Sequence, residues 1–402
     1  MSGPIVVVGG GLAAGKAVAQ LRDSGYDGEL VVLTAEDHPP YERPPLSKDL
    51  LLGEAGPDDT LVQEQGWYAA HDVDLRTGTR VTGLDLAARE VVVGDERIGY
   101  DRLLLATGAR PRPFAPADDS GAPVAYLRTL EDAARIKEQL TEGRRIAVVG
   151  AGWIGLEVAS SARQNGAEVV VLESAAQPLL GVLGDEVAAV FAELHRSHGV
   201  DLRLGTEVTG VRATDDGGVV ELASGDPVPF DLLVVGIGVE PVVELAEAAG
   251  LQVDDGVLVD ASLRTSDPHV WAAGDVANAE HPVLGRRLRV EHWDTASRHG
   301  ETAARSLLGE SVQHDELPYF FTDQYDLGME YVGHPGPEGF DRVVVRGDTD
   351  GLVFTAWWLR GREVVAGMQV NDWDATDEVR RLVGTEVDPD RLADDQVALA
   401  DV

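Results

Sequence analysis

Two stretches of the chain show the same succession of apolar runs and helical periods. Residues 5–8 and 146–149 are short apolar runs rich in β-branched residues, and a second apolar run follows each at 30–34 and 169–172. Between the runs, residues 12–23 and 153–165 repeat apolar positions at helical spacing. Strand, helix and strand in this order predict a βαβ unit of a parallel sheet. The chain therefore contains the same supersecondary unit twice.

A glycine-rich turn joins the first strand of each unit to its helix. In such a turn the first two glycines let the backbone approach a pyrophosphate at the helix N-terminus, and the third small residue lets helix and strand pack closely. A carboxylate after the second strand, Glu36 or Glu173, suits ribose hydroxyls. The small residues of the two turns are Gly9, Gly11 and Ala14, and Gly150, Gly152 and Gly155. Together they predict two dinucleotide sites.

The first turn also overlaps most of a nucleoside triphosphate-binding loop, since residues 10–16 read GGLAAGK. That motif needs a serine or threonine hydroxyl for Mg²⁺ at the next position, which is Ala17 here. The sequence therefore favours dinucleotide binding over triphosphate hydrolysis.

Composition narrows the class of protein. A length of 402 residues suits two or three domains, and 70 acidic against 33 basic residues give a net charge of −37, which disfavours nucleic acid and anionic membranes as partners. The chain has no cysteine, so it has no disulfide, thiolate metal site or redox dithiol. It begins without a basic n-region and contains no long apolar run. We expect a cytoplasmic protein without a membrane span.

Two later strand ends support a pair of dinucleotides. Residues 101–113 form a buried strand that ends at Thr107 and Gly108, followed by a Pro-rich exit, and residues 265–275 end at Gly274 and Asp275. The Asp275 carboxylate can accept a hydrogen bond from a ribityl hydroxyl. The familiar pair of dinucleotides in one protein is FAD with a nicotinamide nucleotide, and these stretches indicate FAD at the first turn.

The chain resembles the FAD-dependent NADH:ferredoxin reductases of the putidaredoxin reductase, rhodocoxin reductase and aromatic dioxygenase reductase type. The resemblance covers essentially the whole chain and is carried by residues 39–48, 126–132, 148–159, 265–275, 289–304 and 318–333. It implies a glutathione-reductase-like α/β fold with two Rossmann-type nucleotide-binding domains and an α+β C-terminal domain. The implied domains are a discontinuous FAD domain (1–110 and 236–312), an NAD domain (111–235) and a C-terminal reductase domain (313–402).

The resemblance also implies roles for individual residues at the FAD site. Ala13 contacts the pyrophosphate, Glu36 the adenosine ribose, and Val81 the adenine through its backbone. Lys48 lies beside the isoalloxazine, where a cation stabilises the negative charge of the reduced flavin. The other implied FAD contacts are Gly9, Gly11, Leu12, Ala14, Arg43, Ala106, Thr107, Gly108, Arg128, Gly274, Asp275, His292 and Trp293.

At the nicotinamide site the resemblance places Glu157 near the nicotinamide ring and Glu173 on the adenosine ribose. Residues 174–181 contain no Arg or Lys to receive a 2′-phosphate, so we expect NADH to be preferred to NADPH. In the relatives, arginines that help hold NADH often stand where this chain has Gln177 and Gly181. A high KM for NADH and a different electron donor therefore stay open as alternatives to tight NADH binding. The other implied contacts are Gly150, Gly152, Trp153, Ile154, Gly155, Gly236, Ile237 and Gly238.

The implied activity is electron transfer from NADH through FAD to a ferredoxin, most simply a [2Fe-2S] protein, with Lys48 and Glu157 as catalytic residues. Arg286, Arg287, Arg289 and Arg298 form the densest basic cluster near a flavin motif and are the predicted docking surface. Two alternatives stay open: a rubredoxin or monodehydroascorbate reductase or general diaphorase of the same fold, and a non-enzymatic NADH-sensing flavoprotein.

No metal site is predicted. His195 and His198 lie close together on one expected helix, but they are an isolated pair, and we expect them to be solvated rather than metal-binding.

Overall fold

The computed structural model describes residues 3–402 and divides into two compact units. Each unit is built from three segments of the chain. Unit 1 comprises Met1–Pro44, Gly56–Arg110 and Val239–Pro318, and unit 2 comprises Pro45–Ala55, Pro111–Gly238 and Tyr319–Val402.

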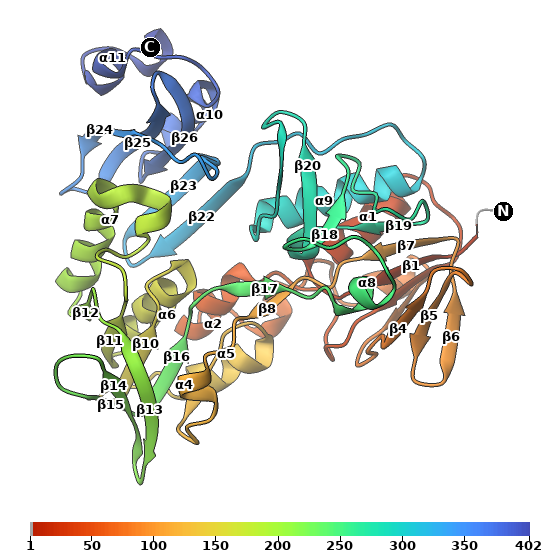
Figure 1. The fold of residues 1–402 in the computed structure, drawn as a ribbon, viewed down its shortest axis with the longest axis horizontal. Coiled ribbons are helices and arrows are strands. Elements are labelled where there is room, and N and C mark those ends of the chain that lie inside the picture. The colour runs from red at the N-terminus through yellow and green to blue at the C-terminus, as the bar shows by residue number, and fades with distance from the viewer. Residues whose placement is uncertain (1–2) are drawn as a thin grey trace. The chain divides into compact units, whose positions relative to one another are not determined.

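A five-stranded parallel sheet forms the centre of unit 1 (Figure 1). Its strands, in spatial order, are β19 (Val270–Ala272), β7 (Arg102–Leu105), β1 (Ile5–Val8), β2 (Leu30–Leu33) and β3 (Val73–Arg76). All residues of β1 and β2 are buried, as expected for a parallel sheet covered on both faces. Ile5 pairs with Leu30 on one side and Arg102 on the other, so the strand ends that carry the first glycine turn and Thr107 lie at one edge.

Two helices of unit 1, α1 (Leu12–Asp23) and α9 (Trp293–Leu307), pack against each other near the sheet (Figure 1). Gly300 makes this contact possible, because a Cβ at that position would lie 2.5 Å from the carbonyl oxygen of Ala13. The two backbones therefore meet directly at the start of α1. The smaller elements of unit 1 are η2 (Pro57–Thr60), α3 (Trp67–Ala70), β4 (Gly83–Asp85), β5 (Glu90–Val93), β6 (Glu96–Gly99), α8 (Glu244–Ala248), β18 (Val257–Val259), η3 (Gly274–Val276), β20 (Ala277–His281) and β21 (Arg286–Leu288). Strands β8 (Ala109–Pro111) and β17 (Val239–Pro241) form a separate two-stranded sheet.

Unit 2 contains a second five-stranded parallel sheet. Its strands, in spatial order, are β12 (Asp201–Arg203), β11 (Glu168–Leu172), β10 (Arg145–Val149), β16 (Leu232–Val235) and β9 (Val124–Ala125). Helix α6 (Trp153–Gln164) follows β10, and α7 (Leu180–Ser197) follows β11. The remaining elements of this part are η1 (Pro44–Ser47), α2 (Asp49–Leu52), α4 (Ala115–Asp118), α5 (Leu130–Lys137) and an antiparallel sheet of β13 (Val208–Thr214), β14 (Gly217–Leu222) and β15 (Val228–Phe230).

The last part of unit 2 is a five-stranded antiparallel sheet with short helices (Figure 1). Its order is β22 (Tyr319–Gln324), β23 (Leu327–Gly333), β26 (Glu363–Val370), β25 (Val353–Arg360) and β24 (Arg342–Asp348). Trp357 and Trp358 are fully buried in β25, and the Nε1 of Trp358 donates to the Leu183 carbonyl of α7 at 2.9 Å. The short helices are η4 (Trp373–Ala375), α10 (Thr376–Leu382), α11 (Pro389–Ala393) and η5 (Leu399–Asp401).

The predicted fold class is confirmed: two parallel-sheet nucleotide-binding folds and a C-terminal α+β part are present. Every boundary predicted for the two βαβ units lies within one residue of the observed element. Over residues 3–402, no helix is both long enough and apolar enough to cross a bilayer.

Candidate functional site

The first glycine turn of unit 1 leaves the N-terminus of α1 open. Gly9 has a φ of +130°, and a Cβ there would lie 2.0 Å from the carbonyl oxygen of Ala106. Gly11 is the N-cap of α1, has no side-chain cap, and would have no atom within 4 Å of an added Cβ. No side chain caps the first N–H groups of α1, which leaves them available to a pyrophosphate at this helix N-terminus.

The segments predicted for FAD in unit 1 converge on this turn. A Cβ on Gly274 would lie 3.1 Å from the Cβ of Ala13, so the strand end that carries Asp275 touches the start of α1. The Gly274 N–H donates to the Nδ1 of His299 at 3.3 Å, which ties this strand end to α9. His292 is the N-cap of α9 and Trp293 its first residue. The structure thus brings four distant stretches of sequence to one place.

Glu36, just after β2, lies in a polar cluster that the sequence analysis identified only in part. Arg43 donates to Glu36 Oε1 at 2.8 Å, and the Tyr41 hydroxyl donates to Glu36 Oε2. Burial opposes the charge of Arg43, but Tyr41 and Glu36 raise its pKa above the usual value. Tyr41 was missed, although it lies between the predicted residues Glu36 and Arg43 and within residues 39–48, which carry part of the resemblance. It orients the carboxylate that is assigned to the adenosine ribose.

The remaining predicted FAD residues of unit 1 differ in what their side chains do. The Thr107 hydroxyl donates to the Val242 carbonyl at 2.7 Å, so it fixes a loop of the same unit. Gly108 has a φ of +69°. Val81 is buried and lies in the segment next to Glu36, since the Gly78 N–H donates to the Glu36 carbonyl at 2.9 Å. Backbone groups rather than side chains are available to a nucleotide here.

The second turn, in unit 2, has the same construction. Gly150 has a φ of +98°, and a Cβ there would lie 2.4 Å from the carbonyl oxygen of Gly236. Gly155 packs on Gly150 so closely that a Cβ would lie 2.2 Å from its carbonyl oxygen. Gly152 is the N-cap of α6, again without a side-chain cap. Gly236, which directly follows β16, thus borders the turn.

Glu173 lies at the end of β11 beside this turn. Its Oε2 accepts from the Ala151 N–H at 2.7 Å, and its Oε1 accepts from the Ala175 N–H at 2.8 Å. These bonds fix the carboxylate at the edge of the turn, where it can receive ribose hydroxyls on its remaining lone pairs.

The segment after Glu173 carries Gln177 and Gly181. It folds back on the turn, because the Leu179 N–H donates to the Ala151 carbonyl at 3.1 Å. Gly181 faces open space, with no atom within 4 Å of an added Cβ. Ile154 is 46% exposed at the start of α6, and Trp153 packs on Phe320 with ring centroids 4.9 Å apart.

Lys48 and Glu157, the predicted catalytic residues, meet in unit 2. The Lys48 Nζ lies 2.9 Å from Glu157 Oε1, with only 12% and 4% of the two side chains exposed. The Ser47 hydroxyl donates to Glu157 Oε2 at 2.5 Å, and the Thr322 hydroxyl donates to Oε1 at 2.5 Å. A buried ion pair needs such additional hydrogen bonds to offset the desolvation of its charges. Ser47 and Thr322 were not among the predicted site residues.

The expectation that His195 is solvated is wrong. His195 is fully buried on α7, and its Nε2 lies 2.8 Å from the Gln324 Oε1 of β22. Burial lowers the pKa of His195 to about 4, although the bond to Gln324 opposes the shift. His198 stacks on the ring of Tyr325 at 3.8 Å. Both histidines therefore attach α7 to the end of β22.

Arg128, which with Lys48 is one of the predicted FAD residues that lie in unit 2, is half-buried just before α5. Its backbone N–H donates to the Asp132 carboxylate at 3.1 Å, which fixes the start of that helix. Among residues 3–402 no group of three or more His, Cys, Asp or Glu side chains is arranged to hold a metal ion.

The four arginines predicted to dock a partner lie in unit 1 among acidic residues. Arg287 pairs with Glu280 at 2.5 Å, and Arg298 pairs with Asp294 at 2.7 Å and Glu316 at 3.2 Å. Arg289 is only 8% exposed and contacts two further carboxylates. Arg286 begins β21 and is half-buried. The positive charge of this surface is thus largely compensated locally.

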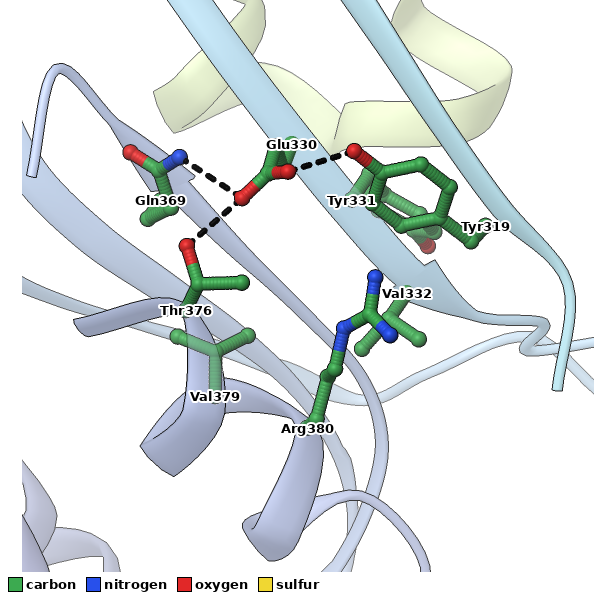
Figure 2. A pocket seen from close by; sticks show the side chains of 8 residues that line it. All are labelled: Tyr319, Glu330, Tyr331, Val332, Gln369, Thr376, Val379 and Arg380. Carbon is green, nitrogen blue, oxygen red and sulfur yellow. Dashed lines mark hydrogen bonds between the residues drawn. The ribbon is translucent and has the colours of Figure 1, made fainter. Parts of the chain in front are cut away.

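A small cavity lies between the C-terminal sheet and α10, and none of the predicted site residues lines it (Figure 2). Its volume is about 10 Å³, room for about one water molecule. Glu330 at its edge accepts from Tyr319, Gln369 and Thr376 at 2.5, 3.1 and 2.6 Å. Burial raises the pKa of Glu330, but these hydrogen bonds together hold it below its usual value. The hydrogen bond from Thr376 to Glu330 attaches α10 to the sheet, and the cavity is too small for a nucleotide.

Comparison with known proteins gives two family matches. A model described as pyridine nucleotide-disulphide oxidoreductase matches residues 3–300, and one described as reductase C-terminal matches residues 319–402. The ferredoxin–NAD(+) reductase component of an anthranilate 1,2-dioxygenase system from Burkholderia cepacia is 42% identical, over 98% of each chain. Putidaredoxin reductase from Pseudomonas putida is 37% identical, over 99% of this chain and 96% of its own.

Solved structures agree with these relatives. Putidaredoxin reductase in its covalent complex with putidaredoxin superposes with a TM-score of 0.95 at 36% identity, over 99% of this chain and 97% of its own. The ferredoxin reductase of the CYP199A2 system from Rhodopseudomonas palustris gives 0.93 at 32% identity, over 99% and 100%. The chain belongs to the pyridine nucleotide-disulphide oxidoreductase family, in the form that ends in a reductase C-terminal domain.

Proposed function

We propose that the protein is a flavoprotein oxidoreductase that passes electrons from NADH through FAD to a small [2Fe-2S] ferredoxin. That ferredoxin supplies a haem monooxygenase or a ring-hydroxylating dioxygenase. The observation that carries the proposal is the buried Lys48–Glu157 pair in a chain with two open glycine turns. The names of two relatives support it, since one is the reductase component of an anthranilate 1,2-dioxygenase system and the other the ferredoxin reductase of the CYP199A2 system.

The residues of unit 1 fit FAD. The uncapped N-terminus of α1 binds the pyrophosphate through N–H groups of the turn, and Glu36, held by Tyr41 and Arg43, accepts the ribose hydroxyls. Asp275, at a strand end that touches Ala13, accepts from the ribityl chain. Trp293 would pack on the flavin, and Val81 would contact the adenine through its backbone.

The residues of unit 2 fit the nicotinamide nucleotide. The uncapped N-terminus of α6 binds its pyrophosphate, Glu173 binds the adenosine ribose, and the strand end at Gly236, Ile237 and Gly238 borders the turn. Bound FAD supplies a group that accepts two electrons together and releases them singly. Lys48 holds a positive charge for the reduced flavin, and Glu157 holds Lys48 in place.

The absence of cysteine from the sequence restricts the route of the electrons. Members of this family that reduce disulfides need a redox-active thiol, which this chain cannot provide. The flavin therefore delivers electrons to its acceptor without a thiol relay. We also propose a cytoplasmic location and the domains 1–110 with 236–312, 111–235, and 313–402.

Purified protein should carry about one non-covalent FAD and reduce a [2Fe-2S] ferredoxin with NADH. The expectation rests on the open first turn and on the lack of a thiol for a covalent flavin link. Flavin released by heat is identified by chromatography, and ferredoxin reduction is followed by its visible absorption. Release of FMN, or a ferredoxin that stays oxidised while ferricyanide is reduced, contradicts the proposal.

NADH should exceed NADPH in kcat/KM by at least roughly tenfold, a difference of about 1.4 kcal/mol in transition-state binding. Glu173 favours free ribose hydroxyls and repels a 2′-phosphate, and no cation follows it within residues 174–181. Glu173→Ala should narrow the ratio by weakening NADH use. Steady-state kinetics with both coenzymes check the expectation, and equal use by the unmodified protein contradicts it.

Arg286 and Arg287 stay the proposed docking residues. Changing both to alanine should slow NADH-dependent ferredoxin reduction and flatten its dependence on salt, with ferricyanide reduction unchanged as the control. Because Arg287 also pairs with Glu280, the unfolding temperature of the variant is measured alongside. Unchanged ferredoxin kinetics over the salt series would place docking elsewhere.

A further inference from the structure

Strand β22 buries two polar side chains on one face. Thr322 and Gln324 are each 1% exposed, while Asp323 between them faces solvent, as the alternation of a strand requires. Burying a hydroxyl and an amide is unfavourable unless both find hydrogen-bond partners. The partners of Thr322 and Gln324 therefore show what this face of the strand is for.

Those partners form one continuous chain to the ion pair. The Nε2 of His195 lies 2.8 Å from Gln324 Oε1, and Gln324 Nε2 donates to the Thr322 hydroxyl at 3.2 Å. The Thr322 hydroxyl in turn donates to Glu157 Oε1 at 2.5 Å. All four side chains are at least nine-tenths buried.

The donor and acceptor of every hydrogen bond in this series follow from the Glu157 carboxylate at its end. The Glu157 carboxylate, paired with Lys48, can only accept, so the single proton of the Thr322 hydroxyl points to it. Gln324 must then offer its NH₂ group to Thr322, which leaves its carbonyl oxygen facing His195. His195 must therefore carry a proton on Nε2, and its Nδ1 has no hydrogen-bond partner. Three successive donors thus all point towards Glu157.

We infer that Thr322 and Gln324, with His195, are positioning residues for the Lys48 ammonium. The inference rests on the proposed function, since Lys48 is assigned to the flavin there. Ser47 fixes one carboxylate oxygen of Glu157 and the directed chain fixes the other, so the carboxylate cannot rotate. Lys48 has a long, flexible side chain, and this fixed carboxylate holds its charge at one point.

The test compares two substitutions at one position in the FAD-loaded protein. Thr322→Val keeps the shape of the side chain and removes the hydroxyl, whereas Thr322→Ser keeps the hydroxyl. In Thr322→Val the midpoint potential of the flavin should become more negative and its reduction by NADH about tenfold slower, because one charge-assisted hydrogen bond is lost. In Thr322→Ser both the midpoint potential and the rate of reduction should stay close to those of the unmodified protein. Thr355→Val is the matched control, because Thr355 is a buried threonine of the same sheet that takes no part in the hydrogen-bond chain.

A second readout does not depend on activity. The chain has only three lysines, Lys16, Lys48 and Lys137, so NMR of lysine labelled at its ammonium nitrogen gives at most three signals. The Lys48 signal, identified by its loss in Lys48→Met, should shift in Thr322→Val and return in Thr322→Ser. A merely structural threonine lowers the unfolding temperature but leaves this signal and the potential unchanged.

Each outcome decides the question. An unchanged potential and Lys48 signal in folded Thr322→Val overturn the inference, even if the protein reduces ferredoxin. If the unmodified protein is not reduced by NADH, the proposed function fails. The NMR comparison then still tests whether the hydrogen-bond chain positions the Lys48 ammonium. If Thr322→Val does not fold, Gln324→Met replaces it and should move the same two readouts in the same direction.

Discussion

Replacing Lys48 with methionine should slow the reduction of the flavin by NADH by about 100-fold, the effect of removing one well-placed electrostatic contact. Methionine nearly matches the length of lysine but has no charge for the reduced flavin. The change also leaves Glu157, only 4% exposed, without its cation, and an unpaired buried carboxylate is strongly destabilising. We therefore expect a lower unfolding temperature as well as a slower reaction.

Stopped-flow absorption at the flavin band measures this rate directly. The control is Lys137→Met, which removes a lysine from an exposed position at the end of α5. It should leave both the rate and the unfolding temperature close to those of the unmodified protein. A Lys48→Met protein that binds FAD and is reduced at the normal rate rules out a role for this cation.

Changing Gly155 to alanine should raise the KM for NADH by about 30-fold, equivalent to a loss of about 2 kcal/mol in binding. The added Cβ, in the first turn of α6, would lie 2.2 Å from the backbone carbonyl oxygen of Gly150, which cannot swing aside as a flexible side chain could. The turn can relieve this contact only by opening, which moves the Ala151 N–H away from Glu173. Both pyrophosphate and ribose contacts are lost together.

Gly181→Ala is the matched control, because an added Cβ there meets no atom within 4 Å. The FAD content of Gly155→Ala should equal that of the unmodified protein, since the first glycine turn belongs to the other unit. An unchanged KM in Gly155→Ala would show that the nicotinamide nucleotide does not bind at this turn.

The two nucleotide turns could be predicted from the sequence because their signals are local. An apolar run, glycines at fixed spacing and a carboxylate after the next strand all fall within about 30 residues, the length of one βαβ unit. The resemblance to known reductases supplied Lys48 and Glu157, which the structure places 2.9 Å apart. It gave no role to Thr322 and Gln324, although both lie in residues 318–333, which carry part of the resemblance. Their link to Glu157 depends on how β22 packs against α6, which the sequence does not show.

His195 shows a signal that was present and overlooked. Val187, Phe191 and His195 are spaced by four residues, which places them on one stripe of α7, and all three are buried. The helical period therefore indicates that His195 is buried. Treating His195 and His198 only as a pair on one helix concealed this signal. The partner Gln324 could not have been found this way, because it depends on how β22 approaches α7.

The hydrogen-bond chain around Glu157 bears on exchanging parts between related reductases. The chain draws on residues 47 and 48, on helices α6 and α7, and on Thr322 and Gln324 of β22, so a graft that begins at the C-terminal sheet cuts through it. A chimaera with a foreign residue at 322 or 324 inherits a mismatched environment for Lys48 even when both parents are active. We therefore expect a chimaera built on this protein to preserve the environment of Lys48 best when β22 is transferred together with α7, which carries His195.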